Sequence, residues 1–303
     1  MSPTSLRFAV GLLVTLTIAV PPSAAQDGAT SSRRTPQAIR ELADFGRIEW
    51  AVEHLPFVAK GPRAGISGMG MVVHQGQIYL CGGFIPAGDE TDDKRSRRSS
   101  RWAYRYAPRE GQWTRLPDMS GRREYTRAIA ATDAIYVLGG ACQFRGAATA
   151  YRPFANCFRL DLSVQPPSWQ SCGKLTVPRT HMAVGRVGNY LVVAGGNQYD
   201  AKSGGYRSST IRGTTDVLDL SKPRQGWQQR APIPGTPRGW TASAVCRQRL
   251  YVLGGLTFGD KGEQIRIPET LCYDPATDCW ISRRPPPMAI SGWEGVTYTD
   301  RYL

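Results

Sequence analysis

The sequence predicts an all-β protein built from repeated four-stranded sheets, and two observations lead to this prediction. A short apolar run closed by two glycines recurs four times, at intervals of 57, 56 and 59 residues, with its first glycine at Gly82, Gly139, Gly195 and Gly254. A tryptophan follows each pair, at intervals of 56, 58 and 53 residues, namely Trp113, Trp169, Trp227 and Trp280. Two residue types that share one period of about 50 residues indicate a repeat protein.

Each repeat divides into four strand-like segments separated by turn residues. In the second repeat these segments are TRAIAAT, AIYVLGG, CFRLDL and WQSCGK. Their β-branched and aromatic residues, and the proline and glycine between them, favour antiparallel sheets over helices. Four strands per repeat predict a β-propeller. We expect four complete blades, over residues 66–119, 123–175, 179–233 and 238–288.

The paired glycines need a physical reason at the end of a strand. Glycine permits positive φ and allows another part of the chain to approach the backbone closely. We expect the tryptophan of a neighbouring strand to lie over this bare backbone, with its ring buried between two sheets.

The two ends of the repeat region are incomplete, so we assign residues 47–303 to the propeller with two partial elements. Residues 47–57 have the pattern of a lone fourth strand, which we expect to complete the last blade. Residues 289–303 align with the start of a fifth blade. We therefore expect an incomplete ring in this chain. The alternative is an open four-blade arc, whose bare edge is a liability for a sheet protein.

The N-terminal segment has the features of a secretory signal. A 13-residue apolar run, FAVGLLVTLTIAV, is short for a bilayer span. Ser23 and Ala25 follow it in the pattern of a signal-peptidase site. We expect residues 1–25 to be a signal peptide and residues 26–46 to be a flexible linker, with an uncleaved anchor as the alternative. The protein is then secreted or periplasmic, with no membrane span after cleavage.

Further motifs accompany the glycine pairs. YAPREGQW and YDPATDCW have Tyr seven residues before Trp, LDLSVQPPSW and LDLSKPRQGW have Asp eight residues before Trp, and LPDM and APIP follow two of these stretches. With these motifs in register over about residues 50–303, the chain resembles the kelch family of β-propellers. The resemblance implies a propeller fold. Exported members of this family include sugar mutarotases such as the one that interconverts the anomers of N-acetylneuraminate, so the resemblance also implies mutarotation as an alternative activity.

Two registers mark a candidate binding site at the start of the blades. Sixteen residues before the glycine pair stand Arg123, Arg179 and Arg238, with Ile66 and Ser291 at the matching positions of the first and fifth repeats. Two residues further on stand Tyr125, His181, Trp240 and, in the fifth repeat, Trp293. Innermost strands line the channel of a propeller, so we expect these side chains to ring its mouth. Arginine forks bind carboxylate, sulfate or phosphate, and aromatic faces stack on sugars or cations. Alternatively, the arginines bind backbone carbonyls between blades and the aromatic rings plug the channel.

The loops between second and third strands are expected on the same rim, and two of them are long, over residues 88–101 and 199–213. Long loops on a rigid scaffold often bind ligands. The chain has a formal net charge of +14, and the basic run KRSRRSSR lies in the first of these loops, after the acidic DETDD. A basic exported protein attracts polyanions, although such a run is more often a solvated loop.

Seven cysteines fit an oxidising compartment, and their odd number leaves at least one unpaired within the chain. Cys157 and Cys172 stand on either side of the turn between the third and fourth strands of the second blade. Cys272 and Cys279 flank the equivalent turn of the fourth blade. Either pair is a disulfide candidate, because connectivity does not follow from sequence. Cys81 and Cys246, which lie inside strand patterns, are expected to be buried.

These features favour a binding module for an anionic carbohydrate or an acidic protein partner, with no specific nucleic-acid partner. The alternative is a sugar mutarotase, which needs a proton donor and an acceptor on opposite sides of the anomeric centre. Its candidate proton-transfer residues are Glu124, His181 and Glu294, with Arg179 or Arg238 as the clamp for a carboxylate. No acidic residue directly follows any glycine pair, so the mutarotase carboxylate has no match. We expect no metal and no cofactor: a zinc site is not indicated, and a galactose-oxidase-like copper site needs two histidines, whereas His54 and His74 are misplaced for it and only His181 remains.

Overall fold

The computed structural model describes residues 65–85, 99–143, 151–200, 209–292 and 295, together with the backbone of residues 13–18 and 48–53. The chain divides into two units, Met1–Val58 and Ala59–Leu303, and each is described by itself. Within the described residues, no helix combines the length and the apolar character that crossing a membrane requires.

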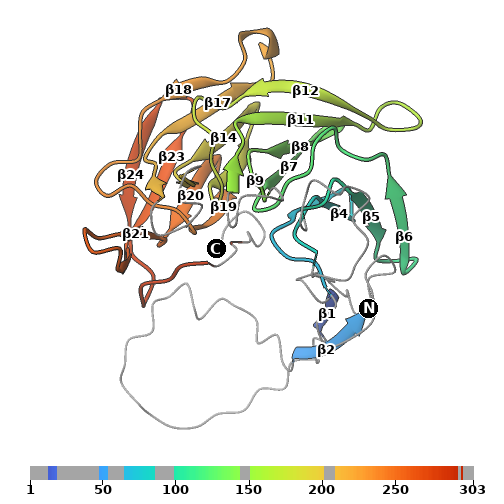
Figure 1. The fold of residues 1–303 in the computed structure, drawn as a ribbon, viewed down its shortest axis with the longest axis horizontal. Helices are drawn as coiled ribbons and strands as arrows, with labels where there is room; N and C mark the ends of the chain where they lie inside the picture. Colours follow the sequence, from blue (N-terminus) through green and yellow to red (C-terminus); the bar gives the residue numbers. More distant parts are fainter. Residues whose placement is uncertain are drawn as a thin grey trace, which may run out of the picture. The chain divides into compact units, whose positions relative to one another are not determined.

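The second unit contains four four-stranded antiparallel sheets, and successive sheets lie side by side (Figure 1). The first blade has the strand order β3-β4-β5-β6, and the second has β7-β8-β11-β12. Their strands are β3 Gly70–His74, β4 Gln77–Cys81, β5 Ala103–Ala107, β6 Gln112–Leu116, β7 Arg127–Ala131, β8 Ala134–Leu138, β11 Asn156–Asp161 and β12 Ser168–Lys174.

The third and fourth blades repeat this arrangement, with the orders β13-β14-β17-β18 and β19-β20-β23-β24. Their strands are β13 Ala183–Val187, β14 Tyr190–Ala194, β17 Thr215–Asp219, β18 Gln228–Arg230, β19 Ala242–Cys246, β20 Arg249–Leu253, β23 Thr270–Asp274 and β24 Cys279–Arg283. A 3₁₀ turn, η2 Pro223–Gln225, precedes β18. Four four-stranded blades are therefore confirmed, and the innermost strands of neighbouring blades pack against one another.

Two-stranded ribbons form where the second and third strands of a blade are joined. They are β9 Ala141–Gln143 with β10 Tyr151–Pro153, β15 Asn197–Gln198 with β16 Thr210–Ile211, and β21 Leu256–Phe258 with β22 Gln264–Arg266. Each ribbon begins directly after a glycine pair, and a β-bridge ties it to the segment before the first strand of its own blade. These ribbons therefore stand on the rim where the blades begin, as the strand order requires. The centres of the two long loops, residues 86–98 and 201–208, lie outside the described residues.

The core lies between the blades, where three apolar clusters bridge successive sheets. The tryptophans of the second, third and fourth blades belong to this layer, where Trp227 is buried and Trp169 and Trp280 are partly buried. The indole N–H of each donates to a backbone carbonyl of the preceding blade: Trp169 to Pro117 at 2.7 Å, Trp227 to Cys172 at 3.1 Å and Trp280 to Ala231 at 2.9 Å. These three tryptophans therefore connect each of these blades to the one before it.

The glycine pairs serve a different contact from the expected one. A Cβ at Gly139 or Gly195 would come within 2.5 or 2.4 Å of a carbonyl oxygen of the next blade, and no indole atom is among the nearest neighbours. The second glycine of each pair donates its N–H to that same carbonyl at 2.8–2.9 Å. The expectation that the tryptophan covers the glycines is wrong, because the next blade's own backbone occupies the space. The carbonyls belong to the junction residues Arg123, Arg179, Arg238 and Ile290.

This pattern corrects the sequence alignment of the fifth repeat by one residue. Gly255 donates to the carbonyl of Ile290 at 2.8 Å, as Gly196 donates to that of Arg238. Ile290, and not Ser291, is therefore the counterpart of the three arginines. Gly292 is correspondingly the counterpart of Trp240. Trp293 and Glu294 lie outside the described residues.

The first unit contains one antiparallel pair, β1 Leu13–Ile18 with β2 Ile48–Glu53. The strand predicted within residues 47–57 is present as β2. It pairs with β1, which lies inside the predicted signal peptide. That residues 47–57 complete the last blade stays a prediction.

Candidate functional site

Five residues at equivalent positions of successive repeats share an unusual backbone conformation. They have φ between +51° and +72°, and they are Gly68, Tyr125, His181, Trp240 and Gly292. Residues with a Cβ atom rarely adopt this left-handed backbone conformation, and a bulky residue in it is a true outlier. The backbone links them around the axis: the Trp240 N–H donates to the His181 carbonyl at 3.0 Å, and the Gly292 N–H to the Trp240 carbonyl at 2.7 Å.

The three side chains at this register form a continuous aromatic stack. The ring centroids of Tyr125 and His181 lie 4.8 Å apart, and those of His181 and Trp240 lie 4.4 Å apart with an interplanar angle of 25°. Tyr125 packs on Gly68, whose Cβ position lies 3.0 Å from the tyrosine ring. The predicted grouping of these three residues is therefore present in the structure.

The ribbons contribute three more rings, which the sequence analysis missed. Tyr151 from β10 lies 6.0 Å from Tyr125 and stacks on Tyr199 at 5.0 Å, while Phe258 from β21 meets Trp240 edge-on at 6.0 Å. A signal was present, because Tyr199 and Phe258 each stand three residues after a glycine pair. The six rings together form the aromatic rim: Tyr125, Tyr151, His181, Tyr199, Trp240 and Phe258.

Polar groups lie beneath the tyrosines of the rim. The Glu124 side chain is fully buried and accepts a hydrogen bond from the Ser99 hydroxyl at 3.2 Å. Burial, followed by the nearby Glu124 charge, raises the pKa of both Tyr125 and Tyr151 above the ordinary tyrosine value. These hydroxyl groups are therefore protonated at neutral pH, and they hydrogen-bond to each other.

His181 is a neutral member of the stack. Burial, followed by the positive charge of Arg127, lowers the pKa of its imidazole to about 3. Its Nδ1 lies 2.8 Å from the Thr180 hydroxyl. The side chain of Arg127, on β7, crosses to the third blade and donates to the Met182 carbonyl at 3.1 Å. Arg127 is thus a cation that accompanies the rings, and the sequence analysis did not single it out.

The structure corrects the predicted ring of arginines. The side chains of Arg123, Arg179 and Arg238 are 1% exposed or less. Arg123 donates to the Gly139 carbonyl at 2.9 Å, and Arg179 to the Gly195 and Thr214 carbonyls at 3.2 and 2.7 Å. These acceptors lie within each arginine's own blade. Arg123 and Arg179 thus bind backbone carbonyls, as in the alternative interpretation, but within one blade and not between blades, and all three arginines are enclosed instead of lining an open mouth.

The charge environment of the three arginines differs from blade to blade. Arg179 forms an ion pair with the fully buried Asp216, and Arg238 pairs with Glu269. Arg123 lies over the rings of Phe158 and Phe154, at 4.3 and 5.4 Å from their centroids. Burial lowers the pKa of Arg123 to about 10, which still leaves it protonated at neutral pH.

The cysteine pairs separate into one that is adjacent and one that is not. Cys272 stands opposite Ile281 while Cys279 stands opposite Asp274, so these two cysteines are offset diagonally by two residues. Diagonal neighbours lie about 7–8 Å apart, which is beyond the reach of a disulfide. The prediction of a Cys272–Cys279 bridge is therefore wrong. Cys81 and Cys246 are buried as expected.

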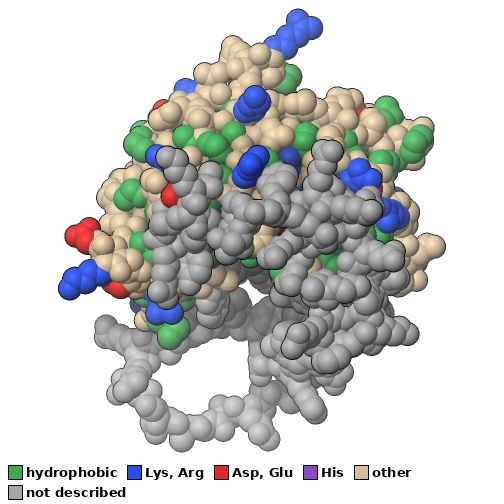
Figure 2. Space-filling model, viewed as in Figure 1, with side chains coloured by type: hydrophobic (Ala, Val, Ile, Leu, Met, Phe, Trp, Pro, Cys, Tyr) green, Lys and Arg blue, Asp and Glu red, His purple; other side chains and the backbone are tan. Residues whose placement is uncertain are grey.

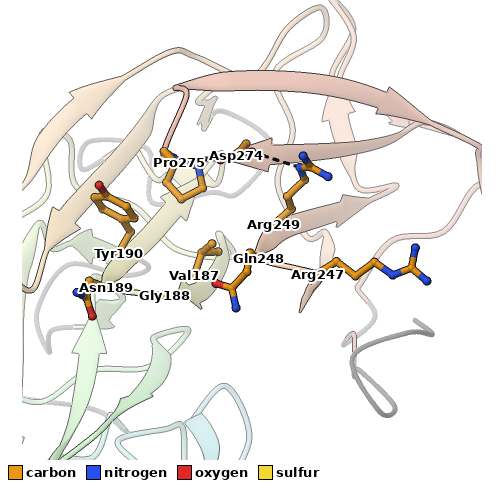
Figure 3. A pocket seen from close by; sticks show the side chains of 10 residues that line it. Val187, Gly188, Asn189, Tyr190, Arg247, Gln248, Arg249, Asp274 and Pro275 are labelled. Atoms are coloured by element: carbon orange, nitrogen blue, oxygen red, sulfur yellow. Dashed lines mark hydrogen bonds and ion pairs between the residues drawn. The ribbon is translucent and has the colours of Figure 1, made fainter.

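A groove opens on the opposite rim, between turns of the third and fourth blades. Its volume is about 260 Å³, and it is lined by Tyr190, Gln248, Pro275 and neighbouring residues. Figure 3 shows Arg249 directed at Asp274, with which it pairs at 3.3 Å, while Arg247 extends away. Because Asp274 already compensates Arg249, we assign no ligand to this groove. No cluster of three or more potential metal ligands occurs among the described residues.

Four repeated sheets whose innermost strands pack side by side define this chain as a β-propeller. A family model of the Kelch motif matches residues 66–120, which span the first blade. The chain is 27% identical over 240 residues to Kelch-like protein terF of Aspergillus terreus, which covers 78% of this chain and 48% of that protein. The chain is therefore similar to kelch-repeat proteins, and the match to the motif itself lies in the first blade.

Other relatives cover smaller parts. N-acetylneuraminate epimerase of Haemophilus influenzae is 31% identical over 86 residues, or 28% of this chain and 23% of that protein. Beta-scruin of Limulus polyphemus is 26% identical over 219 residues, or 69% of this chain and 21% of that protein. A solved structure titled "Structure of YjhT" matches with a TM-score of 0.62 at 14% identity, over 84% of this chain and 79% of that chain, which supports the fold. The chain spans about half the length, or less, of these curated relatives.

Proposed function

We propose that the chain is an exported interaction module whose aromatic rim binds a carboxylated carbohydrate, with an acidic protein segment as the second candidate partner. The observation behind this proposal is the backbone of Tyr125, His181 and Trp240. A residue with a side chain in the left-handed region is strained by about 1–3 kcal/mol. The first and fifth repeats use Gly68 and Gly292 at this position and avoid the strain. Three rings kept at a strained position favour a role for the surface that they form.

The chemistry of the rim suits a sugar acid. Aromatic faces and edges pack against the C–H groups of sugar rings, and the hydrogen-bonded hydroxyl pair of Tyr125 and Tyr151 offers a polar group beside them. Arg127 supplies the positive charge that the three enclosed arginines do not. Among the described residues on the face shown in Figure 2, the visible basic side chains (blue) stand at separate points.

The first test removes a ring without straining the backbone. Trp240→Gly places glycine where two other repeats already have it, so folding should be retained while the ring is lost. A stacked ring is worth about 1.5 kcal/mol, so affinity should fall by about tenfold. The measurement is a glycan array followed by calorimetric titration with the best sugar acid. Gln248→Gly, at a positive-φ turn on the opposite rim, is the matched control and should leave affinity unchanged.

The outcomes of this test are distinct. Binding to acidic peptides, and not to glycans, that is lost in Trp240→Gly would transfer the proposal to the protein partner. Equal affinity of Trp240→Gly and the wild-type chain for every ligand would contradict a role for the rim.

A second candidate function is sugar mutarotation, and one observation favours it. The buried Glu124 lies within electrostatic reach of Tyr125, Tyr151 and Tyr199, which gives an acid and three phenols at one place. Proton donors and acceptors placed together can open and close a pyranose ring. Because Glu124 is fully enclosed, a tyrosine hydroxyl would have to pass its proton to the sugar.

Saturation-transfer NMR tests the enzyme candidate. The chain should accelerate exchange between the anomers of N-acetylneuraminate, and Glu124→Gln should abolish the acceleration while sugar binding persists. Exchange no faster than in buffer would leave only the binding function. Arg179→Ala is not a useful variant here, because it removes a buried structural cation.

A further inference from the structure

Cys157 and Cys172 face each other across a bulge in the outer hairpin of the second blade. Strands β11 and β12 pair Asn156 with Lys174 and Phe158 with Ser171, so Cys172 and Gly173 together stand opposite Cys157. Gly173 has a φ of +88°, the left-handed conformation that glycine commonly supplies at a bulge. Residues directly opposite in an antiparallel pair have Cα atoms about 4.5–5.5 Å apart, which is within the range that a disulfide spans.

The two thiols also lie on the same face of the sheet. Cys157 is a fully buried member of the apolar cluster between the second and third blades, and Cys172 is a partly buried residue packed against that cluster. A hydrogen bond between the two thiols, followed by burial, raises the pKa of Cys172. The side chains are therefore in contact, in contrast to the offset pair Cys272 and Cys279.

A buried cation stands beside this pair. Arg123 lies within electrostatic reach of Cys157 and Cys172. Its nitrogens bond to the Gly139 and Asn156 carbonyls, and no carboxylate contacts it among the described residues. In the next two blades the equivalent arginines pair with Asp216 and Glu269. The second blade thus has two thiols near its arginine where the third and fourth blades have a carboxylate, and the β11–β12 pairing brings these thiols together.

We propose that Cys157 and Cys172 form a disulfide that fastens the β11–β12 hairpin. The oxidant is a small disulfide such as oxidised glutathione. The more exposed Cys172 thiolate attacks one sulfur of the donor, forming a mixed disulfide and releasing one glutathione thiolate. The Cys157 thiolate then attacks Cys172 Sγ, forms the Cys157–Cys172 bond and releases the second glutathione thiolate. The two cysteines lose two protons and two electrons, and the donor is reduced to two thiols.

The bond would act on the contact between two blades. The Cys172 carbonyl accepts the indole N–H of Trp227 at 3.1 Å, and the Trp227 ring lies 3.4 Å from the Cβ position of Gly173. The bulge that the disulfide closes is therefore the surface on which the third blade's tryptophan packs. Fixing it stabilises the junction between the second and third blades.

The test uses the full chain, refolded either in a mixture of oxidised and reduced glutathione or in dithiothreitol. Free thiols are then alkylated, and the digested protein is analysed by mass spectrometry. We expect a linked pair of peptides containing Cys157 and Cys172 after oxidation, and alkylation of both cysteines after reduction. Closing a loop of this length should raise Tm by roughly 5–10 °C.

Variants separate this bond from other thiol chemistry. The double variant Cys157→Ser and Cys172→Ser should lose the difference in Tm between oxidised and reduced protein, whereas Cys279→Ser should retain it. Full alkylation of both cysteines after oxidative refolding would overturn the proposal, and so would a link from Cys157 to any other cysteine. The peptide analysis needs only the wild-type chain, so the result stands even if the double variant fails to fold.

Discussion

The buried arginines show how one residue type solves the same local problem in different settings. Arg123 and Arg179 donate to carbonyls at the glycine pair of their own blades, whereas Arg238 donates to the Thr236 carbonyl and to Glu269. Arg179 and Asp216 are both fully buried, so each charge depends on the other for compensation. Glu269, the partner of Arg238, is 51% exposed, so water also stabilises its charge.

This difference predicts unequal effects of removing the acid. Asp216→Asn leaves a buried guanidinium without its counter-charge, which should lower the free energy of unfolding by about 3–5 kcal/mol. Glu269→Gln removes a partner that water can partly replace, so its effect should stay within about 1 kcal/mol. Urea denaturation of both variants provides the comparison. Equal losses would contradict the assignment of Asp216 as the essential counter-charge.

His181 predicts the direction of one pH effect. In the unfolded chain its pKa takes the ordinary value of 6.5, and in the native stack it is about 3. Between these values the unfolded state binds a proton that the native state does not, so stability falls as the pH is lowered from 6.5 toward 3. Above pH 6.5 the group contributes no pH dependence.

The matched variant is His181→Asn, which tolerates positive φ and does not titrate in this range. Its free energy of unfolding, measured by urea denaturation from pH 7 to pH 4, should fall less steeply than that of the wild-type chain. Each pH unit below 6.5 is worth up to about 1.4 kcal/mol for a single group. If the free energy of unfolding depends on pH equally in the two proteins, His181 takes up its proton as readily in the folded state as in the unfolded state, and the prediction is wrong.

At the scale of elements, the blades are joined by two repeated contacts on opposite sides of each sheet. The tryptophan on a fourth strand reaches back to the preceding blade, and the glycine pair after a second strand receives the backbone of the following blade. Both contacts are specific in geometry, because one uses a single indole N–H and the other tolerates no Cβ. The period of the sequence therefore reflects packing between neighbours more than the needs of a single sheet.

Alanine substitutions should separate two reasons for glycine at these positions, namely the positive φ and the lack of space for a Cβ. At Gly139 a Cβ would lie 2.5 Å from the Arg179 carbonyl oxygen, at a φ of +53°. At Gly111 φ is +63°, but no atom lies within 4 Å of the added Cβ. Gly111→Ala should lose only the conformational term of about 1–2 kcal/mol, and Gly139→Ala should lose distinctly more. Chemical denaturation measures both, and an equal loss would show that φ alone explains the glycine pairs.

Much of the fold could be predicted from these elements, because strand period and paired glycines leave direct marks in the sequence. The groups that contact the glycines could not be predicted. A position that requires glycine shows that another group approaches the backbone closely, but it does not show which group that is. The arginine register was recognisable, yet a buried guanidinium and an exposed one have the same spacing in the chain. Tyr151 and Arg127 were missed because their place in the rim depends on how ribbons and strands of different blades meet.

At the scale of the whole molecule, the export proposal makes its own prediction. When the full chain is produced in a secreting host, the mature protein should begin at Gln26, because Ala25 ends the predicted signal peptide. N-terminal sequencing and intact mass provide the measurement. A product that retains Met1 or begins elsewhere would contradict the cleavage site. Cleavage would also remove β1 and leave β2 without the partner that it has in the uncut chain.

The junction residues have a consequence for how the protein is made. The second glycine of each pair donates its N–H to a carbonyl that is synthesised only when the next repeat begins. These glycines are Gly83, Gly140, Gly196 and Gly255. A nascent blade therefore stays unfinished until the leading residues of its successor emerge from the exit tunnel. Assembly should proceed vectorially from the N-terminal side. A chain that ends before Ile290 would leave the Gly255 N–H in the fourth blade without its carbonyl partner. We expect such a chain to be more susceptible to proteolysis than the full chain.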